Sequence, residues 1–259
     1  MKIRTYIIFI PFIFSLLYLS CATNGNSSDM YGPVKPGDYL TGKFYPSKHE
    51  LFVALSEYGI PANKSQHFLR REAARALKEM YAAFRRDHPE APFWVQSSTR
   101  NYFDQKYIWE GKWIGKIQVM GKDLSRSIRD PLARAVEILK YSSMPGASRH
   151  HWGTDFDLNA LSNSYYESGE GKVLYRWLVK NAQQYGFCQP YTAGRDRGHS
   201  EERWHWSYLP LAGIFLAEWN LHYKNNSRTF SETGRFSGSP DAGSLAPEYM
   251  NAINQDCKE

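Results

Sequence analysis

The chain has 259 residues, of which 42% are hydrophobic and 15% aromatic, so it can bury the core of one large domain or two small ones. This composition argues against a chain that is disordered throughout. The formal net charge of +6 is small and scattered, and no basic run is interleaved with aromatic residues, so we expect no nucleic-acid partner.

The first 21 residues have the three parts of an export signal. Lys2 and Arg4 form a charged start, an apolar run covers residues 6–19, and small residues flank Cys21. A helix that spans a membrane needs about 20 apolar residues, whereas this run is shorter and is interrupted by Pro11. We therefore expect an exported protein of the periplasm or cell envelope rather than one with an N-terminal membrane span.

The end of this segment, LYLSC, resembles the bacterial lipoprotein signal, in which the cysteine becomes the lipidated first residue. Leu19 and Ser20 fit that pattern, whereas Tyr18 departs from it. The resemblance implies lipid on Cys21 and thereby a membrane anchor. Residues 22–36 are polar and rich in Gly, Pro, Asn and Ser, so we expect them to form a flexible tether.

The next part of the chain predicts a helix followed by a strand. Apolar residues recur at steps of three and four within residues 65–86, which predicts an amphipathic helix that stops near Pro89. These residues are Leu69, Ala73, Leu77, Met80, Tyr81 and Phe84. The stretch FWVQSSTR, residues 93–100, is partly apolar and predicts a strand that ends at a polar rim.

Two further helices are predicted between residues 130 and 186. The first begins with Asp130 as its cap and Pro131 at the first helical position. The second, in GKVLYRWLVKNAQQYG, ends at Gly186, which suits a C-terminal cap. Its apolar face holds Val173, Leu174, Trp177 and Leu178.

The order of these elements predicts an α+β fold with one domain over about residues 37–230, because strands and helices are interspersed without a regular βαβ alternation. Beyond Asn225 the chain is polar and rich in Gly and Ser, so we expect residues 231–259 to form a loosely packed tail. Cys188 and Cys257 lie in an exported chain, where they could form a disulfide or remain two unpaired thiols.

Two short clusters carry metal-binding residue types: SRHHWGTDFD (148–157) and EERWHW (201–206). A catalytic zinc site takes three protein ligands and leaves one position for water. His150, Asp157 and His205 could supply two imidazoles and a carboxylate, and Gly153 permits the tight turn that lets the first two converge. Glu202 lies three residues before His205, so a helical turn or tight loop would place both side chains on one side.

Other residues of the two clusters are expected to have structural roles. His151 would point to the opposite face from His150 in an extended segment, so hydrogen bonding or packing is its expected role. Asp155 is the main rival of Asp157 for the carboxylate ligand. Trp204 and Trp206 are expected to wall the site or to pack in the core. Four other histidines are expected to be surface or core residues: His49, His67, His88 and His222.

Together the clusters resemble the paired signature of the zinc D-alanyl-D-alanine carboxypeptidases related to the vancomycin-resistance enzymes. That family belongs to a larger group with lysostaphin-type endopeptidases and the hedgehog signalling domain. The first motif runs Ser, any, His, two of any, Gly, three of any, Asp, and this chain fills it completely with SRHHWGTDFD. The second motif, Glu, any, Trp, His, is matched by ERWH. The similarity extends over about residues 65–208.

The resemblance implies a small antiparallel sheet that carries the zinc site, flanked by helices. It implies that His150, Asp157 and His205 bind one zinc ion and that Glu202 is the catalytic base. The stretch SSTRNYFDQ resembles a family element in which an Arg and a Gln approach the substrate.

Three substrate-facing roles follow from the same resemblance. Arg100 would stabilise the substrate carboxylate or the developing oxyanion, with a surface salt bridge as the rival role. Gln105 would line the cleft. Ser148 would brace the site or hydrogen-bond the substrate, with a structural turn as an equal rival.

Two positions depart from the family pattern, because Asp155 stands where a small residue is common and Arg203 where Pro is common. Both are expected to alter the charge near the cleft. The function implied is a zinc peptidase that cuts next to D-alanine in peptidoglycan stem peptides, most simply by removing the terminal D-Ala. The alternatives are a peptidoglycan endopeptidase and a zinc-holding binding module without turnover.

Overall fold

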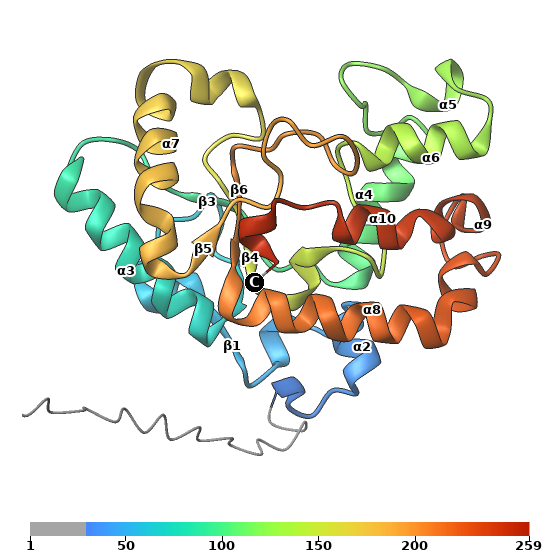
Figure 1. The fold of residues 1–259 in the computed structure, drawn as a ribbon, viewed down its shortest axis with the longest axis horizontal. Coiled ribbons are helices and arrows are strands. Elements are labelled where there is room, and N and C mark those ends of the chain that lie inside the picture. The colour runs from blue at the N-terminus through green and yellow to red at the C-terminus, as the bar shows by residue number, and fades with distance from the viewer. Residues whose placement is uncertain (1–29, 259) are drawn as a thin grey trace, which may run out of the picture.

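The computed structural model describes residues 30–258 (Figure 1). The predicted export signal, Cys21 and residues 22–29 of the predicted tether lie outside this range. Within the described range, no helix is both long and apolar enough to cross a membrane.

A four-stranded antiparallel sheet lies at the centre of the fold, with strand order β3-β4-β6-β5. Its strands are β3 (Val95–Ser97), β4 (Asp155–Leu158), β5 (Phe187–Cys188) and β6 (His205–Tyr208). A second, two-stranded sheet pairs β1 (Phe52–Ala54) with β2 (Phe68–Arg70). The small antiparallel sheet with flanking helices confirms the predicted α+β fold, and β3 confirms the strand predicted within residues 93–100.

Helices cover both sides of the central sheet, with α3 and α7 on one side and most of the others on the opposite side (Figure 1). The α-helices are α2 (Pro36–Leu40), α3 (Arg71–Asp87), α4 (Tyr102–Trp113), α5 (Leu124–Ser127), α6 (Pro131–Leu139), α7 (Gly169–Asn181), α8 (Leu209–Ser231), α9 (Ser239–Ala242) and α10 (Ala246–Asn251). Short 3-10 turns are η1 (Pro46–Lys48), η2 (Leu55–Tyr58), η3 (Arg149–Trp152), η4 (Asn163–Glu167), η5 (Ala182–Tyr185), η6 (Gly243–Leu245) and η7 (Gln255–Cys257).

Helix α3 begins at Arg71, later than the predicted start at residue 65. Leu69, which the apolar periodicity assigned to the helix, is instead a buried residue of β2 and pairs with Val53. The start was misplaced because a buried strand residue just before a helix can continue the helical spacing of apolar positions. The helix ends at Asp87, close to the predicted stop near Pro89.

Helices α6 and α7 follow the sequence prediction closely. The Asp130 carboxylate accepts a hydrogen bond from the Ala133 backbone N–H at 2.7 Å, which caps α6. Gly186 ends the turn after α7 with φ = 79°, a left-handed conformation that favours glycine. On α7, Leu174, Trp177 and Leu178 are buried, but Val173 is 38% exposed, so its assignment to the apolar face was wrong.

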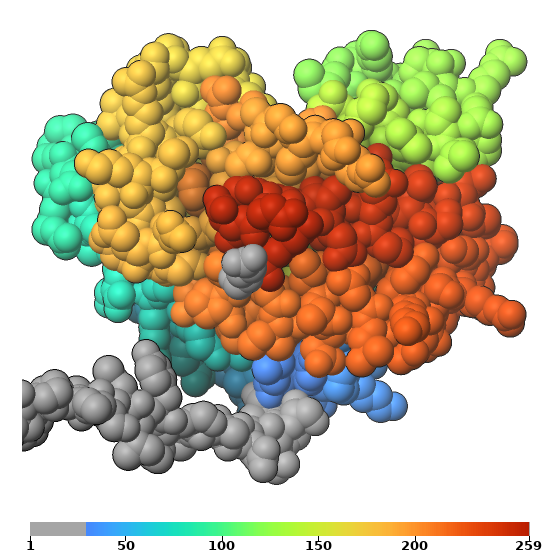
Figure 2. Space-filling view, viewed as in Figure 1, coloured from blue at the N-terminus to red at the C-terminus, as the bar shows by residue number. Residues whose placement is uncertain are grey.

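The C-terminal segment packs against the body of the protein, which contradicts the expected loose tail. Its buried side chains are Phe236, Ala242, Ala246, Tyr249, Met250, Ile253 and Cys257. They join the same hydrophobic core as α4, α6 and α8. Figure 2 shows this segment, coloured red, lying directly against α8. The polar composition hid these isolated apolar residues, because short helical turns bring them to one side.

Two features tie the ends of the described chain to its core. A disulfide joins Cys188 on β5 to Cys257, which resolves the alternative left open by the sequence. Near the N-terminal end, Tyr31 is only 4% exposed and packs against Tyr39 and Phe215. Residues 30–36 therefore do not behave as the flexible tether that their composition suggested.

Candidate metal centre

The central sheet brings His150, Asp157 and His205 together, and one ligand atom from each lies within 4.8 Å of the others. Asp157 and His205 face each other because β4 and β6 pair in a register that places them opposite. His150 comes from turn η3, immediately before β4. Gly153 ends that turn with φ = 77°, and a Cβ atom there would lie 2.3 Å from the Phe52 ring. The turn therefore requires glycine for both its conformation and its close packing.

The two imidazoles present different nitrogens to the carboxylate of Asp157. His150 Nε2 lies 3.4 Å from Asp157 Oδ2, and His205 Nδ1 lies 3.1 Å from Asp157 Oδ1. The other nitrogen of each ring is held elsewhere, since His150 Nδ1 lies 2.9 Å from the Ser98 carbonyl oxygen. His205 Nε2 lies 2.9 Å from Asp155 Oδ1. Each ring thus directs one nitrogen away from the cluster and the other toward the Asp157 carboxylate.

This donor set fits a zinc ion. Two nitrogens and a carboxylate are the three protein ligands typical of catalytic zinc. Asp157 Oδ1 is buried and has no hydrogen-bond partner, so the cluster contains an acceptor atom that the protein itself does not satisfy. Burial alone would raise the pKa of Asp157, but the neighbouring His150 and His205 lower it by a larger amount. The pKa of this carboxyl therefore lies well below its usual range. The carboxylate is therefore ionised, as a metal ligand must be.

The electrostatics of the two histidines differ. Burial, followed by the charge of Arg100, lowers the pKa of His150, which favours the neutral form that binds metals. Burial also lowers the pKa of His205, but the carboxylates of Asp155 and Asp157, which lie 2.9 Å and 3.1 Å from its two ring nitrogens, raise it to about 9. A pKa of about 9 means that Nδ1 carries a proton at neutral pH when no metal is bound. A cation placed at Nδ1 would displace this proton, because a metal competes for the same lone pair.

Glu202 lies beside this cluster in the turn before β6. Its Oε2 is 3.5 Å from His205 Nδ1. The backbone holds it in place, because its N–H donates to the Tyr191 carbonyl at 2.9 Å and its carbonyl accepts from Gln189 Nε2 at 3.1 Å. Burial raises the pKa of Glu202 to about 7, which suits a group that takes up and releases a proton near neutral pH.

Glu201 has a different environment although it is the adjacent residue. Its Oε1 accepts a hydrogen bond from Arg203 Nε at 2.9 Å, and its side chain is 22% exposed. It has no contact with the three cluster residues among the hydrogen bonds and ion pairs of residues 30–258. The two glutamates therefore form a matched pair, of which only Glu202 reaches the cluster.

Arg100 approaches the cluster from the loop after β3. Its Nη1 lies 3.7 Å from Asp157 Oδ2, and its side chain is 23% exposed. Ser97 Oγ accepts from Nη1 at 2.8 Å, and Gln105 Oε1 accepts from Nε at 2.9 Å. Gln105 is itself 1% exposed and donates to the Ser143 carbonyl at 2.7 Å. The structure thus places Gln105 behind Arg100, where it orients the guanidinium, rather than on an open cleft wall.

Three residues of the first motif have distinct environments. Ser148 is buried, and its Oγ has no hydrogen-bond partner in the described structure. His151 uses both ring nitrogens structurally, at 2.7 Å from the Arg100 carbonyl oxygen and 3.1 Å from the Gly146 N–H. Asp155 pairs with Arg149 at 3.0 Å, and both side chains are fully buried. Asp155 therefore lies in the core behind the cluster, where it is paired with Arg149, rather than on an exposed wall of the cleft.

Sequence reasoning missed two residues close to the site. Lys112 lies seven residues after Gln105 on α4 and donates to Ser142 Oγ at 2.5 Å. Burial lowers the pKa of Lys112 to about 8, and the charges of Glu202 and Arg100 act on it. The Tyr191 ring is buried 4.7 Å from the His205 ring. The helical spacing from Gln105 was the one available signal for Lys112, whereas nothing in the sequence indicated Tyr191.

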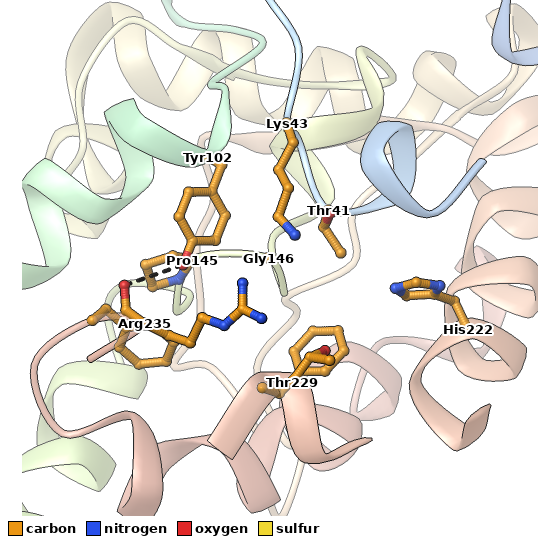
Figure 3. Close-up of a pocket in the computed structure, with 10 residues that line it drawn as sticks. Thr41, Lys43, Tyr102, Pro145, Gly146, His222, Thr229 and Arg235 are labelled. Carbon is orange, nitrogen blue, oxygen red and sulfur yellow. Dashed lines mark hydrogen bonds between the residues drawn. The ribbon is translucent and has the colours of Figure 1, made fainter. Parts of the chain in front are cut away.

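A separate small cavity lies away from the cluster (Figure 3). Its lining residues are Thr41, Lys43, Tyr102, Pro145, Gly146, His222, Thr229, Phe230, Arg235 and Phe236. Its volume of about 30 Å³ accommodates one or two water molecules. It is therefore too small to receive a peptide, and none of the cluster residues lines it.

Comparisons with known proteins agree with the motifs. The VanY family, described as D-alanyl-D-alanine carboxypeptidase, matches residues 66–211. YodJ of Bacillus subtilis (strain 168), whose name gives it provisionally as a carboxypeptidase, is 26% identical over 174 residues. That match covers 66% of this chain and 56% of YodJ, so the chain matches little more than half the length of that relative.

Two solved structures are also similar. One is VanYB in complex with D-alanine-D-alanine, with 23% identity, a TM-score of 0.45, and coverage of 64% of this chain and 83% of that one. The other is the LD-carboxypeptidase LdcB, with 19% identity, a TM-score of 0.47, and coverage of 73% and 87%. The family match spans more than half of the chain and contains the whole cluster, so this protein belongs to the VanY family of D-alanyl-D-alanine carboxypeptidases.

Proposed function

We propose that this protein is a zinc peptidase that removes the terminal D-alanine from peptidoglycan stem peptides. The observation that carries the proposal is the convergence of two imidazoles and a carboxylate within 4.8 Å, with the carboxylate of Glu202, whose side chain is 13% exposed, beside them. Membership of the VanY family supports the choice of substrate.

His150 Nε2, His205 Nδ1 and the Asp157 carboxylate would hold the zinc ion. When bound, zinc polarises a substrate carbonyl and lowers the pKa of a water molecule to about 7. Three protein ligands leave room for that chemistry, whereas a purely structural zinc site uses four. A binding module without turnover also has no need for a buried carboxylate such as Glu202 next to its ligands.

Glu202 would act as the general base. Its carboxylate would take a proton from the attacking water and deliver it to the nitrogen of the leaving D-alanine. A pKa of about 7 allows both steps at neutral pH, because the group gains and loses the proton with little cost in free energy.

Arg100 would act on the negative charge of the substrate. Its guanidinium is fixed by Ser97 and Gln105 and directed at the cluster, so it can stabilise the carbonyl oxygen or bind the terminal carboxylate without reorganising. Lys112 adds a second cation near Glu202. Two cations favour a substrate with a free carboxylate, as in a carboxypeptidase, over the neutral internal bond that an endopeptidase cuts. The unpartnered Oγ of Ser148 is available to hydrogen-bond the substrate.

Release of free D-alanine from a defined pentapeptide stem tests the function. We expect one D-alanine per peptide and a tetrapeptide product, measured by mass spectrometry and by an assay for D-alanine. A cross-linked dimeric stem serves as the competing substrate. Cleavage of the dimer without release of D-alanine would identify an endopeptidase, and a zinc-loaded protein that cleaves neither substrate would identify a binding module.

We also propose that the protein is exported and anchored by lipid on Cys21. The pairing of Cys188 with Cys257 supports an oxidising compartment, and the family acts on the cell wall. The Cys21→Ser variant is expected to lose acyl labelling and to remain as a signal-bearing or a soluble protein, because the polar residues 22–29 have no affinity for a bilayer. Metabolic labelling with a fatty-acid analogue measures this, and labelling equal to that of the parent protein would refute the anchor.

A further inference from the structure

A fully buried polar cluster lies behind His205, on the side away from Asp157. We call Arg149, Thr154, Asp155 and Ser207 the support cluster. Asp155 is its centre: Oδ1 accepts from Arg149 Nε at 3.0 Å, and Oδ2 accepts from Ser207 Oγ at 3.0 Å and Thr154 Oγ1 at 2.5 Å. All four residues are at most 1% exposed.

Burying such a cluster lowers the free energy of unfolding unless its polar groups are well paired. Burying an ion pair costs several kcal/mol per ion in lost hydration, and apolar residues of similar volume often serve stability equally well. Arg149 Nη1 moreover has no hydrogen-bond partner, so the pair is not even fully satisfied. Stability alone therefore does not account for a carboxylate at position 155.

The remaining contact of Asp155 gives the reason. Oδ1 lies 2.9 Å from His205 Nε2, so the carboxylate accepts the ring N–H from behind. This contact holds the ring in the orientation that directs Nδ1 toward Asp157 and Glu202. The register of the sheet sets the geometry, because Asp155 pairs with Ser207 and Asp157 pairs with His205 on the same two strands.

The two histidines are thus supported differently. His150 donates to a neutral backbone carbonyl of Ser98, whereas His205 donates to an ionised carboxylate. A carboxylate behind a ligating imidazole makes the ring a stronger electron donor and holds its orientation. Arg149 keeps that carboxylate charged in the core.

We propose that Asp155 is a positioning residue for the zinc centre, which acts through His205 and does not bind the metal itself. Arg149 is assigned the role of counter-ion that lets this carboxylate remain buried. The inference rests on the proposed function, in that His205 is taken as a zinc ligand.

The test separates zinc affinity from fold stability in the full-length protein. The variants are Asp155→Ala, the double variant Arg149→Met/Asp155→Ala, and Ser207→Ala as the control. The zinc dissociation constant is measured by competition with a chromophoric chelator, and the melting temperature is measured on the metal-free protein. Neither readout requires peptide substrate.

Asp155→Ala is expected to weaken zinc binding by about 10- to 100-fold and to lower the metal-free melting temperature, because Arg149 loses its partner. The double variant restores a neutral core, so its melting temperature should recover while zinc affinity stays weak. Ser207→Ala removes two hydrogen bonds of the support cluster, one from Arg149 and one to Asp155, without touching the His205 ring, so its zinc affinity should match that of the parent protein.

Three outcomes would overturn the inference. Recovery of zinc affinity together with stability in the double variant would make the support cluster a purely structural device. Complete loss of zinc in Asp155→Ala would make Asp155 a ligand. If the parent protein binds one zinc ion and Asp155→Ala binds it with equal affinity, the inference alone is refuted. If the parent protein binds no zinc, the proposed function is refuted as well.

Discussion

Glu202→Gln is expected to lower kcat by at least about 100-fold, the effect typical of losing a general base, while the protein still binds one zinc ion. Glutamine keeps the shape and the hydrogen-bonding capacity of the side chain but accepts no proton. Zinc content should persist because Glu202 lies beside the three proposed ligands without being one of them. The Michaelis constant should change little, since Arg100 and the ligands are untouched. Steady-state kinetics on a pentapeptide, with metal analysis of the same sample, measures both.

Glu201→Gln is the matched control for this experiment. Glu201 bonds to Arg203 and lies on the partly exposed side of the same turn, so the variant should keep nearly full activity. The reverse result, with Glu201 essential and Glu202 dispensable, would show that the motif is shifted by one residue. Full activity in both variants would contradict the hydrolase mechanism.

His150→Ala and His205→Ala should each lose both zinc and activity. Either change leaves two of the three proposed protein ligands, whereas catalytic zinc sites have three. Metal analysis after dialysis is expected to fall from about one zinc ion per chain to background, with folding followed by circular dichroism. His222→Ala is the control, because His222 is only partly buried and lies in the separate cavity of Figure 3.

Metal analysis also shows whether Asp157 or Asp155 is the carboxylate ligand. Asp157→Ala should empty the site under conditions in which Asp155→Ala still holds zinc at saturating concentration. Normal zinc content in either histidine variant would refute the ligand assignment, and an empty site in Asp155→Ala alone would exchange the roles of the two aspartates.

The residues of the metal cluster were predictable because each short motif encodes local geometry and the two motifs together resemble a known family, whereas the pairing of β4 with β6 that joins them is a long-range contact. Gly153 indicated the tight turn that places His150 next to β4, and the spacing from Glu202 to His205 indicated a shared side. Both contacts depend on residues a few positions apart. The type of the main helices was predictable for the same reason, since an amphipathic period and a cap such as Asp130 are local features.

Long-range contacts account for what the sequence left open. The partner of Cys188 depended on how the C-terminal segment packs, and that segment is held by apolar residues scattered through a polar composition. The role of Asp155 depended on contacts with residues distant in sequence, because Asp155 and Asp157 share one face of β4 and only the contact with Arg149 and with the far side of the His205 ring separates them. Leu69 shows the limit of periodicity, which does not mark where a strand gives way to a helix.

The pairing of Asp157 with His205 couples metal binding to folding. The two residues stand opposite each other on β4 and β6, so an ion held between them also fastens the two central strands together. A ligand that binds only the folded state adds RT ln(1 + [L]/Kd) to the free energy of unfolding, about 4 kcal/mol when it is present at a thousand times its Kd. Zinc bound there would therefore stabilise the folded protein as well as supply the chemistry of the site.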